Sequence, residues 1–170
     1  MLRLAFTKAE TSLDPAKVVD LYSRNITAHI FEALYTYDHL ARPAKIKPLV
    51  AAGMPQVSDD FKVWTVRLQP GIYFQSDAAF KGQRRELVAQ DFVYAFKRIV
   101  DPANKSPIAS SVLDDKYVGL KALHDDAVKN RKPFDYDKPI EGLQALDRHT
   151  VRFTLEEPRP RLLETLAAVD

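Results

Sequence analysis

The feature that most constrains the fold is a helical block placed between two strand patterns that lie far apart in the chain. Residues 61–68, FKVWTVRL, are rich in the β-branched and aromatic residues that favour strands. Residues 141–155 contain EGLQAL and HTVRFTL, which alternate around a turn. This alternation predicts a β-hairpin whose core-facing side chains are Val151, Phe153 and Leu155.

Two helices are predicted between these strands. The first carries an apolar stripe at helical spacing, and Asp101-Pro102 ends it because a proline disfavours the helical conformation of the residue before it. Its stripe consists of Phe92, Val93, Phe96, Ile99 and Val100. The second helix is indicated by Tyr117, Leu120, Leu123, Ala127 and Val128. Strand pairs joined by turns, with helices inserted as blocks, favour an α+β fold with a mixed, largely antiparallel sheet and packed helices.

The first forty residues show weaker patterns. Residues 2–6 alternate and predict a strand, and Asp14-Pro15 then turns the chain. Apolar residues from Ile26 to Leu34 predict a helix of about three turns that starts near Ser23. Residues 36–38 are expected to form a short strand.

The middle of the chain and its end complete the prediction. Prolines and a glycine predict one long loop over residues 41–58. The QPG at 69–71 separates 61–68 from IYF at 72–74, and this predicts two strands around a turn. Residues 161–169, RLLETLAAV, predict a closing helix, after which the sequence stops abruptly. We therefore expect the chain to be part of a longer protein.

Composition excludes several classes of function. A formal charge of +2, spread along the chain, is too weak to indicate nucleic acid or an anionic membrane as a partner. No apolar run approaches the ~20 residues of a membrane span, and the apolar run in the opening MLRLAF is too short for a secretory signal. The absence of cysteine removes thiolate chemistry and thiolate metal ligands.

Motifs for catalysis or cofactor binding are also missing from the sequence. The five glycines form no phosphate-binding loop, and no serine lies in a G-x-S-x-G turn. The four histidines include no pair spaced for a metal, and adjacent acids are best explained as helix caps or solvated residues. Phe92 and Phe96 are expected in the core. These observations favour a binding or structural domain without catalytic residues, cofactor or metal.

Several stretches together resemble a known family. SLDP followed by NITAHIFEALYTYD, then SDDFKVWTVRLQPGIYF, AQDFVYAFKRIVDPANKSP and EGLQALDRHTVRFTLEEPRP are similar, in order and spacing, to the family 5 extracellular solute-binding proteins of ABC importers. That family includes the oligopeptide- and dipeptide-binding proteins. The resemblance runs from about Leu2 to Ala168.

The resemblance implies a place for this chain in a two-lobed periplasmic binding protein of type II-like fold. The chain would be its N-terminal third. Residues 1–40 would supply the first strand, a ligand-proximal loop and a helix of lobe I, and residues 41–170 a family-specific α+β subdomain. The second lobe would follow residue 170. Such receptors are monomers without enzymatic activity that act in the periplasm or outside the cell, free or lipid-anchored, and dock on a membrane permease.

The resemblance also implies ligand-binding positions. In peptide-binding members, the segment after the Leu-Asp-Pro turn lies along the ligand, and here it matches Val19, Asp20, Leu21 and Tyr22. Oligopeptide binders have a tyrosine directly after a Ser-Pro pair, where this chain has Ile108. Ile108 would shape a pocket by size and would not offer a hydroxyl. We expect these five residues to line one wall of the ligand cleft.

Two departures from the family pattern leave the ligand open. The loop at 75–86 is longer than usual, and Val88 replaces a helix-capping threonine, a loss that Asp91 in the first turn is expected to offset in part. A peptide is the leading ligand. The alternatives are a receptor for another solute, such as nickel, a glycoside or an opine-like compound, and a fragment of a cytosolic enzyme.

Overall fold

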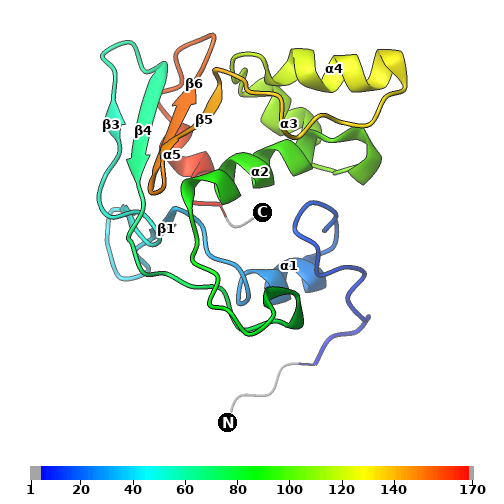
Figure 1. The fold of residues 1–170 in the computed structure, drawn as a ribbon. Helices are drawn as coiled ribbons and strands as arrows, with labels where there is room; N and C mark the ends of the chain where they lie inside the picture. The colour runs from blue at the N-terminus through cyan, green and yellow to red at the C-terminus, as the bar shows by residue number, and fades with distance from the viewer. Residues whose placement is uncertain (1–4, 169–170) are drawn as a thin grey trace.

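The centre of the fold is a four-stranded antiparallel sheet. The computed structural model describes residues 5–168. The strands follow the order β3 (Gln56–Val57), β4 (Val63–Arg67), β6 (Thr150–Thr154) and β5 (Leu143–Asp147), as Figure 1 shows. The two central strands, β4 and β6, come from the two ends of the predicted block. Their pairing therefore brings the two ends of that block together at the centre of the sheet.

The hairpin and its core-facing residues are confirmed. β5 and β6 pair in antiparallel register and turn at residues 147–150. Val151 and Phe153 are fully buried, and Leu155 is 2% exposed. Across the central pair, Phe153 lies opposite Trp64. The alternating pattern thus places the apolar side chains of β6 on the covered face of the sheet.

The helix predicted from the apolar stripe is also confirmed, as α2 (Ala89–Val100). α2 packs on β5 and β6, while α3 (Ala109–Asp114) and α4 (Leu120–Asn130) pack against α2 (Figure 1). Val88 makes no side-chain cap, but the carboxylate of Asp91 accepts a hydrogen bond from the Val88 N–H at 2.8 Å. The expected compensation by Asp91 is therefore present.

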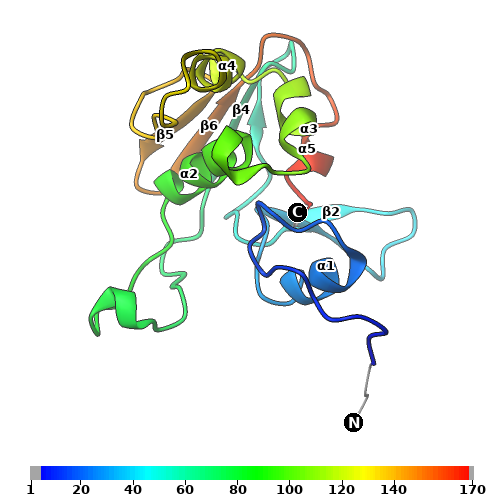
Figure 2. The same cartoon turned by 90° about the vertical axis from the view of Figure 1, so that its right-hand side faces the viewer.

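A smaller unit lies below the sheet in Figure 2. It contains α1 (Leu21–Thr27) and the two-stranded pair of β1 (Tyr35–Tyr37) and β2 (Ile46–Pro48). The closing helix α5 (Leu162–Thr165) leads into it, since the Tyr35 N–H donates to the Leu166 carbonyl at 3.2 Å. The N-terminal segment and the end of the described chain are thus joined. The short 3₁₀ turns η1 (Ala78–Phe80) and η2 (Pro102–Asn104) complete the elements.

The prediction of a second strand at residues 72–74 is wrong. β4 already has β3 on one edge and β6 on the other, so no edge remains for residues 72–74 to pair with. β4 ends at Arg67, and the chain then turns at Gly71, whose φ is +82°. Residues 72–74 pair instead with the far end of the loop. Leu87 N–H donates to the Ile72 carbonyl at 2.8 Å, and Phe74 N–H to the Arg85 carbonyl at 2.9 Å.

Other boundaries also differ from the sequence prediction. The region 41–58 is not one loop, because it contains β2 and β3. The helix expected from Ser23 starts at Leu21 and ends at Thr27, so Leu34 lies beyond it. The strand expected at residues 2–6 lies largely outside the described residues. Within residues 5–168, no helix has the length and apolar character needed to cross a membrane.

Glu86 joins three segments near the hairpin turn and makes the fold sensitive to acid. One carboxylate oxygen accepts from the Gly71 N–H at 2.9 Å and lies 3.2 Å from His149 Nε2, and the other accepts from Arg148 Nη2 at 2.6 Å. These bonds, that from Gly71 first, lower the pKa of Glu86 to about 2 from an ordinary value of 4.5.

Because the folded-state pKa is depressed, the stability that Glu86 supplies is present above pH 4.5 and is lost as the pH falls toward 2. We expect Glu86→Gln to be less stable than wild type at pH 6, with the difference shrinking as the pH falls to 3. Urea unfolding at pH 6, 4 and 3 measures this, with the exposed Glu141→Gln as control. A Glu86→Gln difference that is constant over this range would contradict the assignment.

Candidate ligand-binding site

The segment Val19–Tyr22 forms the entrance to α1. Val19 is 63% exposed and Leu21 is 68% exposed, so both apolar side chains face solvent. Asp20 lies between them as the N-terminal cap of α1, and its carboxylate accepts from the Ser23 N–H at 2.8 Å. The structure therefore presents two apolar side chains on either side of a residue that is held by its own helix.

Asp20 is fixed by a local network centred on Ser23, which is fully buried. The Ser23 hydroxyl donates to Asp20 Oδ2 at 2.6 Å and accepts from the Thr11 N–H at 3.0 Å, while the Thr11 hydroxyl donates to Asp20 Oδ2 at 2.5 Å. The hydroxyls of Ser23 and then Thr11 hold the pKa of Asp20 well below its ordinary value. The carboxylate is thus ionised and already bonded within the protein.

The side chain of Tyr22 contacts the N-terminal segment. Its ring lies 5.0 Å from that of Phe6, and its hydroxyl is hydrogen-bonded to the Thr7 hydroxyl. These contacts fix the beginning of α1 to the preceding chain. The side chain of Tyr22 therefore stabilises the segment by contacting Phe6 and Thr7.

Ile108 lies at the start of α3, away from this segment in the sequence but linked to it through α2. It is partly buried, and its carbonyl accepts from the Val112 N–H at 3.1 Å in the first turn of α3. The structure thus places Val19, Asp20, Leu21 and Tyr22 together at α1 and Ile108 separately at α3. α3 itself was not predicted from the sequence.

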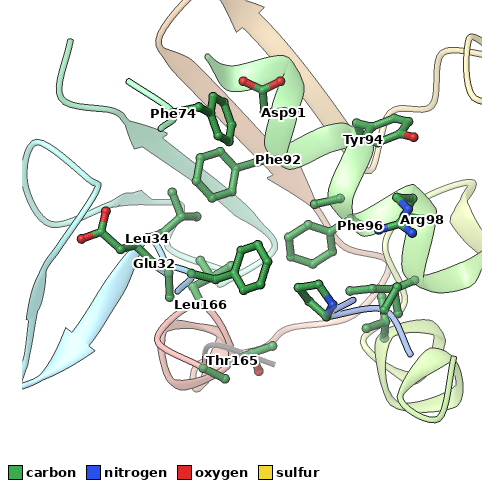
Figure 3. Close-up of a pocket in the computed structure, with 18 of the residues that line it drawn as sticks. Glu32, Leu34, Phe74, Asp91, Phe92, Tyr94, Phe96, Arg98, Thr165 and Leu166 are labelled. Carbon is green, nitrogen blue, oxygen red and sulfur yellow. The ribbon is translucent and has the colours of Figure 1, made fainter. Parts of the chain in front are cut away.

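A pocket of about 530 Å³ lies along α2, which supplies more of its lining residues than any other element (Figure 3). Pro15, the last residue of the Leu-Asp-Pro turn, lines it together with Ala16, and Val112 lines it one turn after Ile108. The five predicted residues are not among its lining residues. Most of the wall is apolar, and the charged residues at the pocket are Glu32, Arg85, Asp91 and Arg98.

Phe92 and Phe96 pack against the core, as expected, and they also line the pocket. Both residues line the pocket together with Ile99, and both are only partly buried (Figure 3). Val93 and Val100 of α2 are fully covered in the core, whereas Phe92, Phe96 and Ile99 pack against the core with part of their surface and line the pocket with another part. The sequence already indicated that α2 covers more than one surface, since its apolar residues include neighbours at i and i+1.

Metal binding has no support in the described part of the chain. Among residues 5–168, no group of three or more histidine or acidic residues is placed to hold an ion.

Comparison with known proteins places these features in a family. Residues 45–170 match the bacterial extracellular solute-binding proteins, family 5, in the middle region of the family. The periplasmic oligopeptide-binding protein OppA of Escherichia coli (strain K12) is 34% identical over 155 residues, which are 91% of this chain and 25% of that protein. Di/tripeptide-binding protein 2 of Pseudomonas aeruginosa (strain UCBPP-PA14) is 31% identical over 160 residues, covering 94% of this chain and 27% of that protein.

The fold agrees with solved structures of the same kind. Haemophilus influenzae OppA in complex with RPPGFSPFR matches with a TM-score of 0.74 and 27% identity, over 95% of this chain and 28% of that chain. The chain thus spans about a quarter of the length of the curated relatives it matches. It has the mixed helix and antiparallel sheet of one part of a two-lobed binding protein. The family consists of solute-binding proteins, not enzymes. From the match over residues 45–170, the chain belongs to family 5 of the bacterial extracellular solute-binding proteins.

Proposed function

We propose that this chain is the N-terminal part of the peptide-binding component of an ABC importer, acting in the periplasm or outside the cell. The observation that carries the proposal is the family match, joined to relatives named for oligopeptides and di/tripeptides that cover more than nine-tenths of the chain. The receptor, free or lipid-anchored, would act as a monomer and deliver its ligand to a membrane permease.

The division of the chain follows the same proposal. Residues 1–40, with the ligand-proximal loop and α1, would belong to lobe I, and residues 41–170, with the four-stranded sheet, would form the family-specific subdomain. The second lobe would follow and close over the ligand. The link between β1 and the chain after α5, through Tyr35 and Leu166, supports this division because both ends of the subdomain return to the same small unit.

The geometry of the α1 entrance suits backbone recognition of an extended peptide. A peptide presents N–H and C=O groups whatever its sequence, so pairing with a backbone segment gives affinity without strict selectivity. The carboxylate of Asp20 already accepts hydrogen bonds from Ser23 and Thr11. We therefore expect this segment to bind the peptide through backbone groups and not through the Asp20 side chain. Val19 and Leu21 would contact the ligand with their exposed side chains, and Ile108 would limit side-chain size from α3.

Titration calorimetry tests the proposal. We expect the family-length protein that contains this chain to bind short peptides with a Kd of about 1 μM or below, a binding free energy of about −8 kcal/mol. The 170-residue chain alone should bind weaker than about 1 mM, because a ligand would meet only one open wall. Matched titrations with nickel, a glycoside and an opine test the other solute classes.

Two outcomes would contradict the proposal. Tight binding of one of those solutes, with no peptide binding, would assign the receptor to a non-peptide ligand. Micromolar peptide affinity of the 170-residue chain alone would show that the whole site lies within these residues and that the second lobe is not required.

A further inference from the structure

One ion pair connects the turn before the α1 entrance to α2. Arg98 donates to both carboxylate oxygens of Asp14, from Nη1 to Oδ1 at 2.8 Å and from Nη2 to Oδ2 at 2.6 Å. The two residues are 84 positions apart, and Asp14 belongs to the Leu-Asp-Pro turn. Asp14 Oδ1 also accepts from the Ala16 N–H at 3.2 Å, so the carboxylate holds the turn and the helix at once.

The same arginine also fixes the segment that leads to Ile108. Its carbonyl accepts from Asn104 Nδ2 at 2.8 Å, which ties η2 to the end of α2. Tyr136 supports η2 from the other side, since its hydroxyl donates to Asp101 Oδ2 at 2.7 Å. Ile108 follows η2 by four residues. Arg98 is therefore bonded through its side chain to the turn that precedes Val19–Tyr22, and through its backbone carbonyl to Asn104, which precedes Ile108. It also lines the pocket (Figure 3).

The Asp14–Arg98 ion pair is expected to add little to the stability of the fold. The side chains are 31% and 26% exposed, and ion pairs that water reaches contribute little to stability. A bidentate arginine–carboxylate pair does, however, fix orientation as well as distance, because two parallel bonds define a plane. Its largest effect should therefore be on the relative position of the segments it joins.

We propose that Asp14 and Arg98 are positioning residues, which set the distance and angle between the α1 entrance (Val19–Tyr22) and Ile108 and so shape the wall on which the peptide lies. The inference rests on the proposed function. It does not require either side chain to contact the ligand.

The test measures peptide affinity in the family-length protein for Asp14→Asn, Arg98→Gln and the double variant. Each single variant should weaken binding at least tenfold, and the double should be within about twofold of the weaker single, because breaking the pair once removes its effect. Arg98→Lys keeps the charge but not the two parallel bonds, so its affinity should fall between wild type and Arg98→Gln. If the affinity loss of the double variant equals the product of the two single-variant losses, the two residues act independently and the inference is overturned.

Arg161→Gln is the matched control. Arg161 also makes a bidentate ion pair, with Glu164 at 2.9 and 2.6 Å, but that pair is local and exposed. Its loss should leave affinity within twofold of wild type. Hydrogen exchange of the 170-residue chain supplies a second readout. Arg98→Gln should speed exchange at residues 11–24 and leave residues 143–154 unchanged, and equal acceleration in both regions would indicate general destabilisation and contradict positioning.

The controls separate the two proposals. A wild-type protein that binds no peptide would overturn the proposed function. If wild type binds peptide and Arg98→Gln binds it within twofold of the wild-type affinity, the positioning role is overturned and the proposed function stays intact.

Discussion

Replacing Phe153 by alanine should lower the free energy of unfolding of the chain by about 3–5 kcal/mol, because it empties the centre of the core. Phe153 is fully buried on β6. Its ring lies 5.5 Å from that of Phe96 on α2 and 6.1 Å from that of Tyr117. It also pairs with Trp64 across the sheet. The side chain therefore contacts both layers, and neighbours held by strand pairing cannot collapse fully into the space.

Urea unfolding followed by circular dichroism measures this loss. Leu40→Ala is the control, since Leu40 is 92% exposed and its truncation should change stability by less than about 0.5 kcal/mol. A loss below about 1 kcal/mol for Phe153→Ala would mean that the sheet and α2 do not share one core.

Replacing Gly142 by alanine should cost about 3 kcal/mol, although it adds only one methyl group. Gly142 lies where three segments cross. Its N–H donates to the Val118 carbonyl at 2.8 Å, and its carbonyl accepts from the Thr154 N–H at 3.1 Å. A Cβ at this position would lie 2.5 Å from the Val118 nitrogen and 2.6 Å from the Val118 oxygen. Both are backbone atoms, so no side chain can rotate away to make room.

Gly53→Ala is the matched control for this change. A Cβ at Gly53 would meet no atom within 4 Å, so the same substitution should change stability by less than about 0.5 kcal/mol. Thermal unfolding of both variants makes the comparison directly. Equal stability of Gly142→Ala and Gly53→Ala would show that the three segments do not approach as closely as the structure has them.

Periodicity predicted the parts of the fold in which one face alone is buried. The hairpin of residues 143–154 and α2 were found from sequence because their apolar residues recur at the spacing of the element that contains them. Residues 72–74 have equal strand propensity, but β4 had no free edge for them. Pairing is a property of the whole sheet, and a local pattern does not contain it.

Local hydrogen bonds explain the misplaced start of α1. Both Asp20 and Ser23 are good helix caps, so composition could not choose between them. The choice is made by Ser23 being buried, where its hydroxyl serves Thr11 and Asp20 instead of a helix end. The pocket was missed for a related reason. Phe92 and Phe96 have the spacing of core residues and do pack against the core, and only the arrangement of the other elements shows that they also line a pocket.

The proposed ligand-binding residues depended on resemblance more than on physical pattern. Val19 and Leu21 show no periodicity that distinguishes them from other apolar residues of a turn, and Ile108 precedes a helix that the sequence did not reveal. The link between the two groups through Asp14 and Arg98 spans 84 residues, and no local motif indicates it. Such links become visible only when the chain is folded.

The central claim is that a peptide lies against the entrance of α1, and a crystal structure of the family-length protein with a bound peptide tests it most directly. The account predicts backbone hydrogen bonds between the peptide and the segment Val19–Tyr22, with Ile108 in contact within about 4.5 Å. A complex in which the peptide binds elsewhere, with none of Val19, Asp20, Leu21, Tyr22 and Ile108 within that distance, would contradict it.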